Sequence, residues 1–107
     1  MTWEWWQRAK LRSKAKDAAD TFLKHMRFPN ATMDEAQQAH TLLSVVFQDG
    51  FFAAIDEIKY ELAVADFLVK VHEKYPADAS EEMVRRGDTN LKLAFRLGYE
   101  KGQAARP

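Results

Sequence analysis

Residues 33–75 have the sequence MDEAQQAHTLLSVVFQDGFFAAIDEIKYELAVADFLVKVHEKY. Within this stretch, apolar and imidazole side chains recur at steps of three and four without a slip. On a helical wheel they fall within an arc of about 100°, which is the signature of an amphipathic helix. The pattern predicts a long helical region in an all-α protein. The stripe consists of Ala36, His40, Leu43, Phe47, Phe51, Ala54, Ile58, Leu62, Ala65, Val69 and His72.

Asp49 and Gly50 are residues that commonly end a helix, yet the helical phase of the apolar stripe continues across them. One straight helix over 33–75 would be about 64 Å long at roughly 1.5 Å per residue. A compact chain of this size has a radius of gyration of only about 13 Å. Because glycine commonly ends helices, we expect a break or kink near Gly50. The alternative is a single extended helix that protrudes and pairs with a second copy.

A second apolar set begins at Tyr60 and leaves only a narrow polar strip on residues 58–75. A helix that is apolar over most of its circumference lies at the centre of a core or between partners. We therefore expect 58–75 to be the central helix. The predicted core side chains are Phe47, Phe51, Ile58, Leu62, Phe67 and Leu68, and the second set is Tyr60, Val64, Phe67, Leu68, Val71 and Tyr75.

The flanking segments complete a single helical domain over 1–107. Residues 1–28 form a basic, tryptophan-rich first helix that should end before Pro29, because proline disfavours helix at the preceding residue. Thr32 and Glu35 have the spacing of a capping box. Residues 80–103 are predicted to form the C-terminal helices, namely a short helix ended by a glycine and then a final helix. The whole is predicted to be a small bundle of four to five helices.

In the C-terminal region, Ser80 or Asp78 is the expected cap of a helix over Glu81–Arg86. Gly87 is the expected C′ residue that ends it. The last helix should carry its apolar side chains on one face, namely Leu91, Ala94, Phe95, Gly98 and Tyr99.

The composition argues against an enzyme. The chain has no cysteine, so disulfides, thiolate zinc sites and cysteine nucleophiles are absent. Its four glycines stand singly rather than in a phosphate-binding loop, and no Glu-x-x-His or His-Glu-x-x-His spacing occurs. We therefore predict no catalytic residue, no metal site and no cofactor. His40 and His72 share the apolar stripe and could face one another around a metal, although such histidines more often hydrogen-bond locally at the edge of a core.

Location follows from the same reasoning. The longest strictly apolar run is Phe51–Ile55, far shorter than the roughly 20 residues that a bilayer-spanning helix needs. With no signal-peptide pattern and no cysteine, the expected location is the cytoplasm.

The N-terminus is the one unusual feature. Trp3, Trp5 and Trp6 precede a run of basic residues. Trp3 and Trp6 fall outside the apolar stripe of the first helix, which consists of Leu11, Ala15, Ala18, Phe22 and Met26. These tryptophans either pack on another helix of the same chain, anchor a subunit or partner interface, or meet an anionic surface. We favour the partner interface, with Trp3, Trp5, Trp6, Arg8 and Arg12 as its contacts.

The charge distribution supplies the competing hypothesis. The net charge is zero, yet residues 1–28 carry seven basic residues against three acids, and 29–75 carry three against eight. The basic and acidic segments pair with each other within the fold or between subunits, or the basic segment faces an anionic partner. The residues 83–90 also resemble a helix-turn-helix turn, although flanked by charges where packing needs apolar groups. Nucleic acid is therefore the alternative partner, through Lys10, Lys14, Lys16, Arg85 and Arg86.

The sequence thus predicts a non-enzymatic helical interaction protein that forms a homo-oligomer, binds a protein partner, or does both. A membrane surface ranks below nucleic acid as an alternative.

Overall fold

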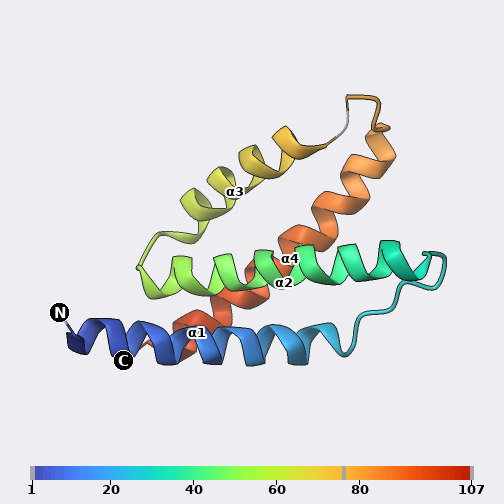
Figure 1. Ribbon diagram of the computed structural model, residues 1–107. Helices are drawn as coiled ribbons and strands as arrows, with labels where there is room; N and C mark the ends of the chain where they lie inside the picture. The colour runs from blue at the N-terminus through green and yellow to red at the C-terminus, as the bar shows by residue number, and fades with distance from the viewer. Residues whose placement is uncertain (1, 76, 107) are drawn as a thin grey trace.

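The computed structural model describes residues 2–75 and 77–106, with side chains described from Trp5 onward (Figure 1). Over these residues the chain forms four helices and no strand. They are α1 (Thr2–Leu23), α2 (Met33–Ile55), α3 (Tyr60–Lys74) and α4 (Glu81–Ala105). The predicted all-α bundle is confirmed. In the described part of the chain, no helix combines the length and apolar content that crossing a bilayer requires.

Helix α1 runs alongside α2 in the opposite direction (Figure 1). It ends at Leu23, five residues before the predicted end at Phe28. The start of α2 is as predicted: the Thr32 hydroxyl accepts a hydrogen bond from the Glu35 backbone N–H at 3.1 Å and satisfies one of the free helix-start donors. The stacked rings of Phe22 and Phe47, 5.5 Å apart between centroids, join the two helices.

Helices α2 and α4 make the most extensive helix–helix contact among the described residues, and their backbones approach closely where they cross. A Cβ added to Gly50 would meet the backbone carbonyl of Phe95, and one added to Gly98 would meet the backbone carbonyl of Phe47. Gly102 stands in the same relation to Phe51. The two backbones therefore touch directly, which only glycine permits.

The predicted break at Gly50 is wrong. Helix α2 continues through Gly50, which is buried against α4. The chain turns six residues later, at a C-terminal cap in which the Ile58 N–H donates to the Ala53 carbonyl and the Glu57 N–H to that of Ala54, each at 3.0 Å. This is a Schellman motif, with Glu57 at φ 60° where glycine is usual. The long helix over 33–75 is thereby two helices.

The predicted division of the C-terminal region is also wrong. Helix α4 is continuous from Glu81 to Ala105 and passes through Gly87. Its start is as expected, because the Ser80 hydroxyl accepts from the Met83 N–H at 3.1 Å. A single glycine in a helix costs only about 1 kcal/mol, and Gly87 gives room to the hydroxyl of Tyr75 from α3. The predicted apolar face is confirmed, with Leu91, Ala94, Phe95, Gly98 and Tyr99 all buried.

Helix α3 is peripheral rather than central, which corrects the expectation for 58–75. Only Ala63 and Phe67 are buried on it, whereas α2 buries six residues. Ile58 and Leu62, predicted to be in the core, are 44% and 65% exposed. The reason is that the second apolar set faces inward, so the continuation of the α2 stripe faces solvent.

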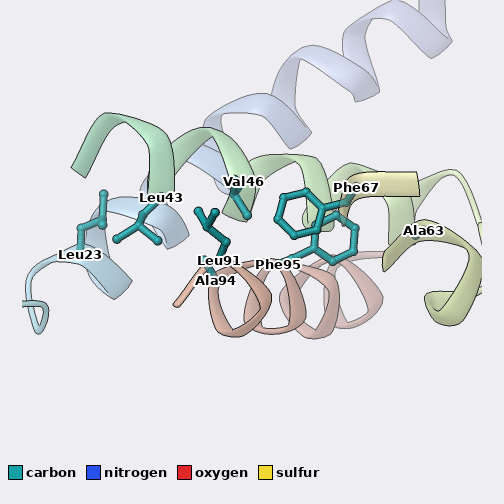
Figure 2. Close-up of a cluster of buried hydrophobic side chains, with 8 residues drawn as sticks. All are labelled: Leu23, Leu43, Val46, Ala63, Phe67, Leu91, Ala94 and Phe95. Atoms are coloured by element: carbon teal, nitrogen blue, oxygen red, sulfur yellow. The ribbon is translucent and has the colours of Figure 1, made fainter. Parts of the chain in front are cut away.

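The core lies between α2 and α4, closed by α1 on one side and α3 on the other. Phe47, Phe51 and Phe67 are buried as predicted, and Leu68 packs against the cluster while partly exposed. The Phe67 ring stacks on Phe95 at 4.8 Å between centroids and attaches α3 to α4 (Figure 2). Figure 2 shows the cluster formed by Leu23, Leu43, Val46, Ala63, Phe67, Leu91, Ala94 and Phe95.

Candidate interaction site

The N-terminal end of α1 presents two large aromatic side chains to solvent. Trp5 is 64% exposed and Trp6 60% exposed. Their rings meet edge to face, with centroids 6.2 Å apart and planes at 85°. The explanation that they pack on another helix of the same chain does not hold for these two. The side chain of Trp3 lies outside the described residues.

The position of α1 explains this exposure. Arg8 pairs with Asp56, the residue that caps the end of α2. The turns of α1 before Arg8 therefore lie beyond the end of α2, as Figure 1 shows. When α1 is viewed along its axis, Trp6 also lies on the side opposite the buried Ala15.

Arg8 fixes this end of the helix to the rest of the fold. Its Nη1 and Nη2 donate to the two carboxylate oxygens of Asp56 at 3.0 and 3.4 Å. Its guanidinium also lies 5.0 Å from the centre of the Phe52 ring. The hydrogen bond with Asp56 raises the pKa of Arg8. Arg8, predicted as a partner contact, is thus engaged within the chain and positions the tryptophans.

The remaining predicted basic residues form two separate groups. Lys10, Arg12, Lys14 and Lys16 are exposed along α1, and Arg85 and Arg86 are exposed near the start of α4. The start of α4 and the start of α1 lie at opposite ends of the molecule (Figure 1). Arg86 is also paired with Glu82 at 2.7 Å. Because α4 is continuous there, the helix-turn-helix interpretation of 83–90 is wrong.

The two histidines of the stripe do not face one another. His40 packs edge-on against Phe28, with ring centroids 5.3 Å apart. The Nε2 of His72 lies 2.7 Å from a carboxylate oxygen of Asp88. No cluster of three or more His, Asp or Glu side chains suited to a metal ion occurs among the described residues.

Asp88 joins α3 to α4 at the far end of the molecule from the tryptophans. Besides His72, it accepts a hydrogen bond from the Tyr75 hydroxyl at 3.3 Å. Burial, followed by the charge of Asp88, raises the pKa of the Tyr75 hydroxyl. These contacts attach the C-terminal end of α3 to α4.

A groove between α2 and α3, with α4 as its floor, was not predicted. Its volume is about 620 Å³ and its walls are mainly apolar, including Val45, Val46, Phe67, Leu91 and Phe95. Asp49 lines it, and desolvation raises the pKa of this carboxyl. The sequence signal was present as apolar residues beside the stripe, such as Leu42 and Val45, which are 45% and 50% exposed.

Compared with protein-family models, with curated proteins and with solved structures, the chain has no significant match to any of them.

Proposed function

We propose that this protein is a non-enzymatic interaction protein that self-associates and binds another macromolecule through its tryptophan-rich, basic N-terminal helix. The observation that carries the proposal is the exposure of Trp5 and Trp6 on a helix end held by Arg8. Exposed tryptophans on a rigid element are effective interface anchors, because they bury a large area at a small cost in side-chain entropy.

The surroundings of the tryptophans indicate the chemistry of the partner surface. Trp5, Arg12 and Lys16 are spaced by seven and four residues, so they share one side of α1. Arg12 and Lys16 are both exposed. A protein surface with an apolar pocket and acidic residues at its edge would complement this face.

Nucleic acid is the alternative partner, bound by Lys10, Lys14 and Lys16 with Arg85 and Arg86. The separation of the two basic groups and the Arg86–Glu82 pair favour the protein partner. Salt distinguishes the two cases, since phosphate contacts weaken by orders of magnitude between about 50 and 200 mM salt.

Intrinsic fluorescence gives the experiment a site-specific signal, because all three tryptophans of the chain lie within residues 3–6. The protein that co-purifies with the full chain is isolated, and its binding is titrated by tryptophan emission. We expect Trp6→Ala to weaken binding at least tenfold and Arg12→Ala to weaken it less. Binding of the unmodified chain should change little with salt.

The matched control is Met83→Ala, which removes an apolar side chain that is 59% exposed on α4. It should leave the affinity within about twofold, as expected for a residue outside the interface. If Trp5→Ala and Trp6→Ala bind as tightly as the unmodified chain, the proposal is wrong. If Lys10→Ala and Lys14→Ala abolish a strongly salt-dependent binding, the nucleic-acid alternative replaces it.

A further inference from the structure

Helix α3 carries an apolar face that nothing in the described chain covers. This outer stripe consists of Leu62, Ala65 and Val69, all exposed, with Leu62 at 65% and Val69 at 60%. It lies on the side of α3 opposite Phe67, whose ring is buried against α4. In Figure 1, α3 forms an outer edge of the bundle. The helix is therefore apolar on both faces but packed on only one.

The spacing of the outer stripe is that of a helix–helix seam. Leu62, Ala65 and Val69 follow one another at steps of three and four, the alternation found at the a and d positions of a coiled coil. On this assignment Asp66 lies on one flank of the stripe, and Glu61 lies on the other. Lys59 immediately precedes α3, one heptad before Asp66.

The charges on the flanks select the orientation of a second identical helix. In a parallel pair, a residue on one flank meets the residue five positions later in the sequence, on the opposite flank of the second copy. This would place Glu61 of one copy beside Asp66 of the other. That contact would be repulsive and would occur twice. In an antiparallel pair, residues of the same flank meet, so Lys59 of one copy would face Asp66 of the other, also twice.

The antiparallel arrangement also fits the sizes of the side chains. It places Leu62 against Ala65 of the second copy, and by symmetry Ala65 against Leu62. Lys59 makes no ion pair with another described side chain, and Asp66 is paired only with Lys70, at 3.0 Å on the exposed surface. Lys59 and Asp66 are both exposed, so a charge from a second molecule can reach them.

We propose that a second copy of this chain covers the outer stripe, forming a twofold pair of antiparallel α3 helices. This inference specifies the surface for the self-association proposed above and does not involve the N-terminal tryptophans. A seam of so few residues gives a pair that forms and dissociates with concentration.

The first experiment measures the mass of the full chain by sedimentation equilibrium over a wide concentration range. We expect a reversible equilibrium between a 12.4 kDa monomer and its dimer. Leu62→Glu should raise the dissociation constant at least tenfold, because it places a charge in the seam. Met83→Glu is the control, since it places the same charge at an exposed apolar site on α4. It should leave the equilibrium unchanged.

The second experiment tests whether the occupant is this chain itself. Lys59→Glu and Asp66→Lys should each weaken self-pairing, because each makes both flank contacts repulsive. Mixed together, the two variants should pair with each other at least as tightly as the unmodified chain. Circular dichroism checks that both remain helical. If the mixture pairs no better than either variant alone, the proposed flank contacts are wrong.

A single cysteine tests the orientation, because the chain has no other. In the antiparallel pair the two copies of residue 69 would lie about 16 Å apart along the axis, at roughly 1.5 Å per residue. A disulfide needs Cα atoms within about 7 Å. Val69→Cys should therefore resist oxidative cross-linking within the dimer, and rapid cross-linking would overturn the antiparallel pairing.

Two outcomes separate this inference from the function proposed for the N-terminus. If the chain stays monomeric at millimolar concentration, the α3 pairing is wrong, whereas partner binding at Trp6 is unaffected. If Trp6→Ala abolishes the dimer while Leu62→Glu does not, the self-association surface is the N-terminal helix and this inference is overturned.

Discussion

The α2–α4 crossing and helix α3 show how differently two apolar helical segments can be used. At the crossing, glycines bring two backbones into contact and the surrounding Phe47, Phe51 and Phe95 are at most 3% exposed. On α3, by contrast, Phe67 is buried, but Leu62 and Val69 remain more than half exposed.

The difference teaches that the apolar content of a helix does not by itself determine how much of it is buried. Helix α3 has apolar side chains on two faces, and the fold supplies neighbours for only one. Helices α2 and α4 approach so closely because small residues, rather than large ones, lie at the point of contact. Four predictions test this contrast, from the largest expected effect to the smallest.

The largest effect is expected at the crossing. Gly98→Ala should lower the free energy of unfolding by about 3 kcal/mol or more, at the top of the range for overpacking. The added methyl would meet the backbone of Phe47, which cannot move independently of α2. Urea unfolding followed by circular dichroism measures the change.

Gly87→Ala is the matched control for this prediction. Its methyl would meet only the hydroxyl end of the Tyr75 side chain, and alanine favours the helix by up to about 1 kcal/mol. The stability should change by no more than about 1 kcal/mol in either direction. Equal losses for Gly98→Ala and Gly87→Ala would contradict backbone contact at the crossing.

The second prediction concerns the attachment of α3. Phe67→Ala should lower the stability by about 2 kcal/mol, less than the roughly 3–5 kcal/mol of a fully enclosed phenylalanine, because Phe67 borders the open groove. Amide hydrogen exchange should accelerate across α3 more than across α2 and α4. Val69→Ala, on the outer stripe, should change stability by less than about 0.5 kcal/mol in the monomer. Uniform acceleration across all helices would show that α3 is integral to the core.

The third prediction addresses the turn that separates α2 from α3. Glu57→Gly should raise the stability by about 0.5–1 kcal/mol, because it relieves a side chain held at φ 60°. Gln38→Gly, at an exposed position within α2, should instead lower it by up to about 1 kcal/mol. Thermal unfolding of both variants provides the comparison. A loss of stability on Glu57→Gly would mean that its carboxylate contributes to the turn.

The smallest effect is expected at Asp49. Desolvation raises the pKa of this carboxyl in the folded protein, so its ionisation opposes folding as the pH rises above the ordinary value of about 4. Asp49→Asn should therefore be slightly more stable than the unmodified chain at pH 7, and the gain should disappear at pH values below about 4.

Asp34→Asn is the control of opposite sign, because Asp34 lies in the first turn of α2, where the helix dipole favours a negative charge. That substitution should lower stability at neutral pH. Urea unfolding at both pH values measures the two differences. A destabilising Asp49→Asn at neutral pH would show that Lys70 and Lys74 outweigh desolvation at this carboxyl.

For the predicted interaction residues, the sequence likewise revealed local features but not the contacts between distant segments. The sequence identified the tryptophans as unusual, since two of them fall outside the stripe of their own helix. It could not show that Arg8 is held by Asp56, because these residues are 48 positions apart. It also could not show the groove, which exists only where three helices diverge.

What the sequence determined by itself is local. Helical periodicity and the caps at Thr32 and Ser80 follow from neighbouring residues, whose effects act within one or two turns. The tertiary structure decided which of two apolar faces on α3 is buried and why Gly50 lies inside a helix. Both depend on where α4 lies, and Phe95 contacts Gly50 across 45 residues of chain. Burial is set by such distant neighbours, because water is excluded only where two segments meet.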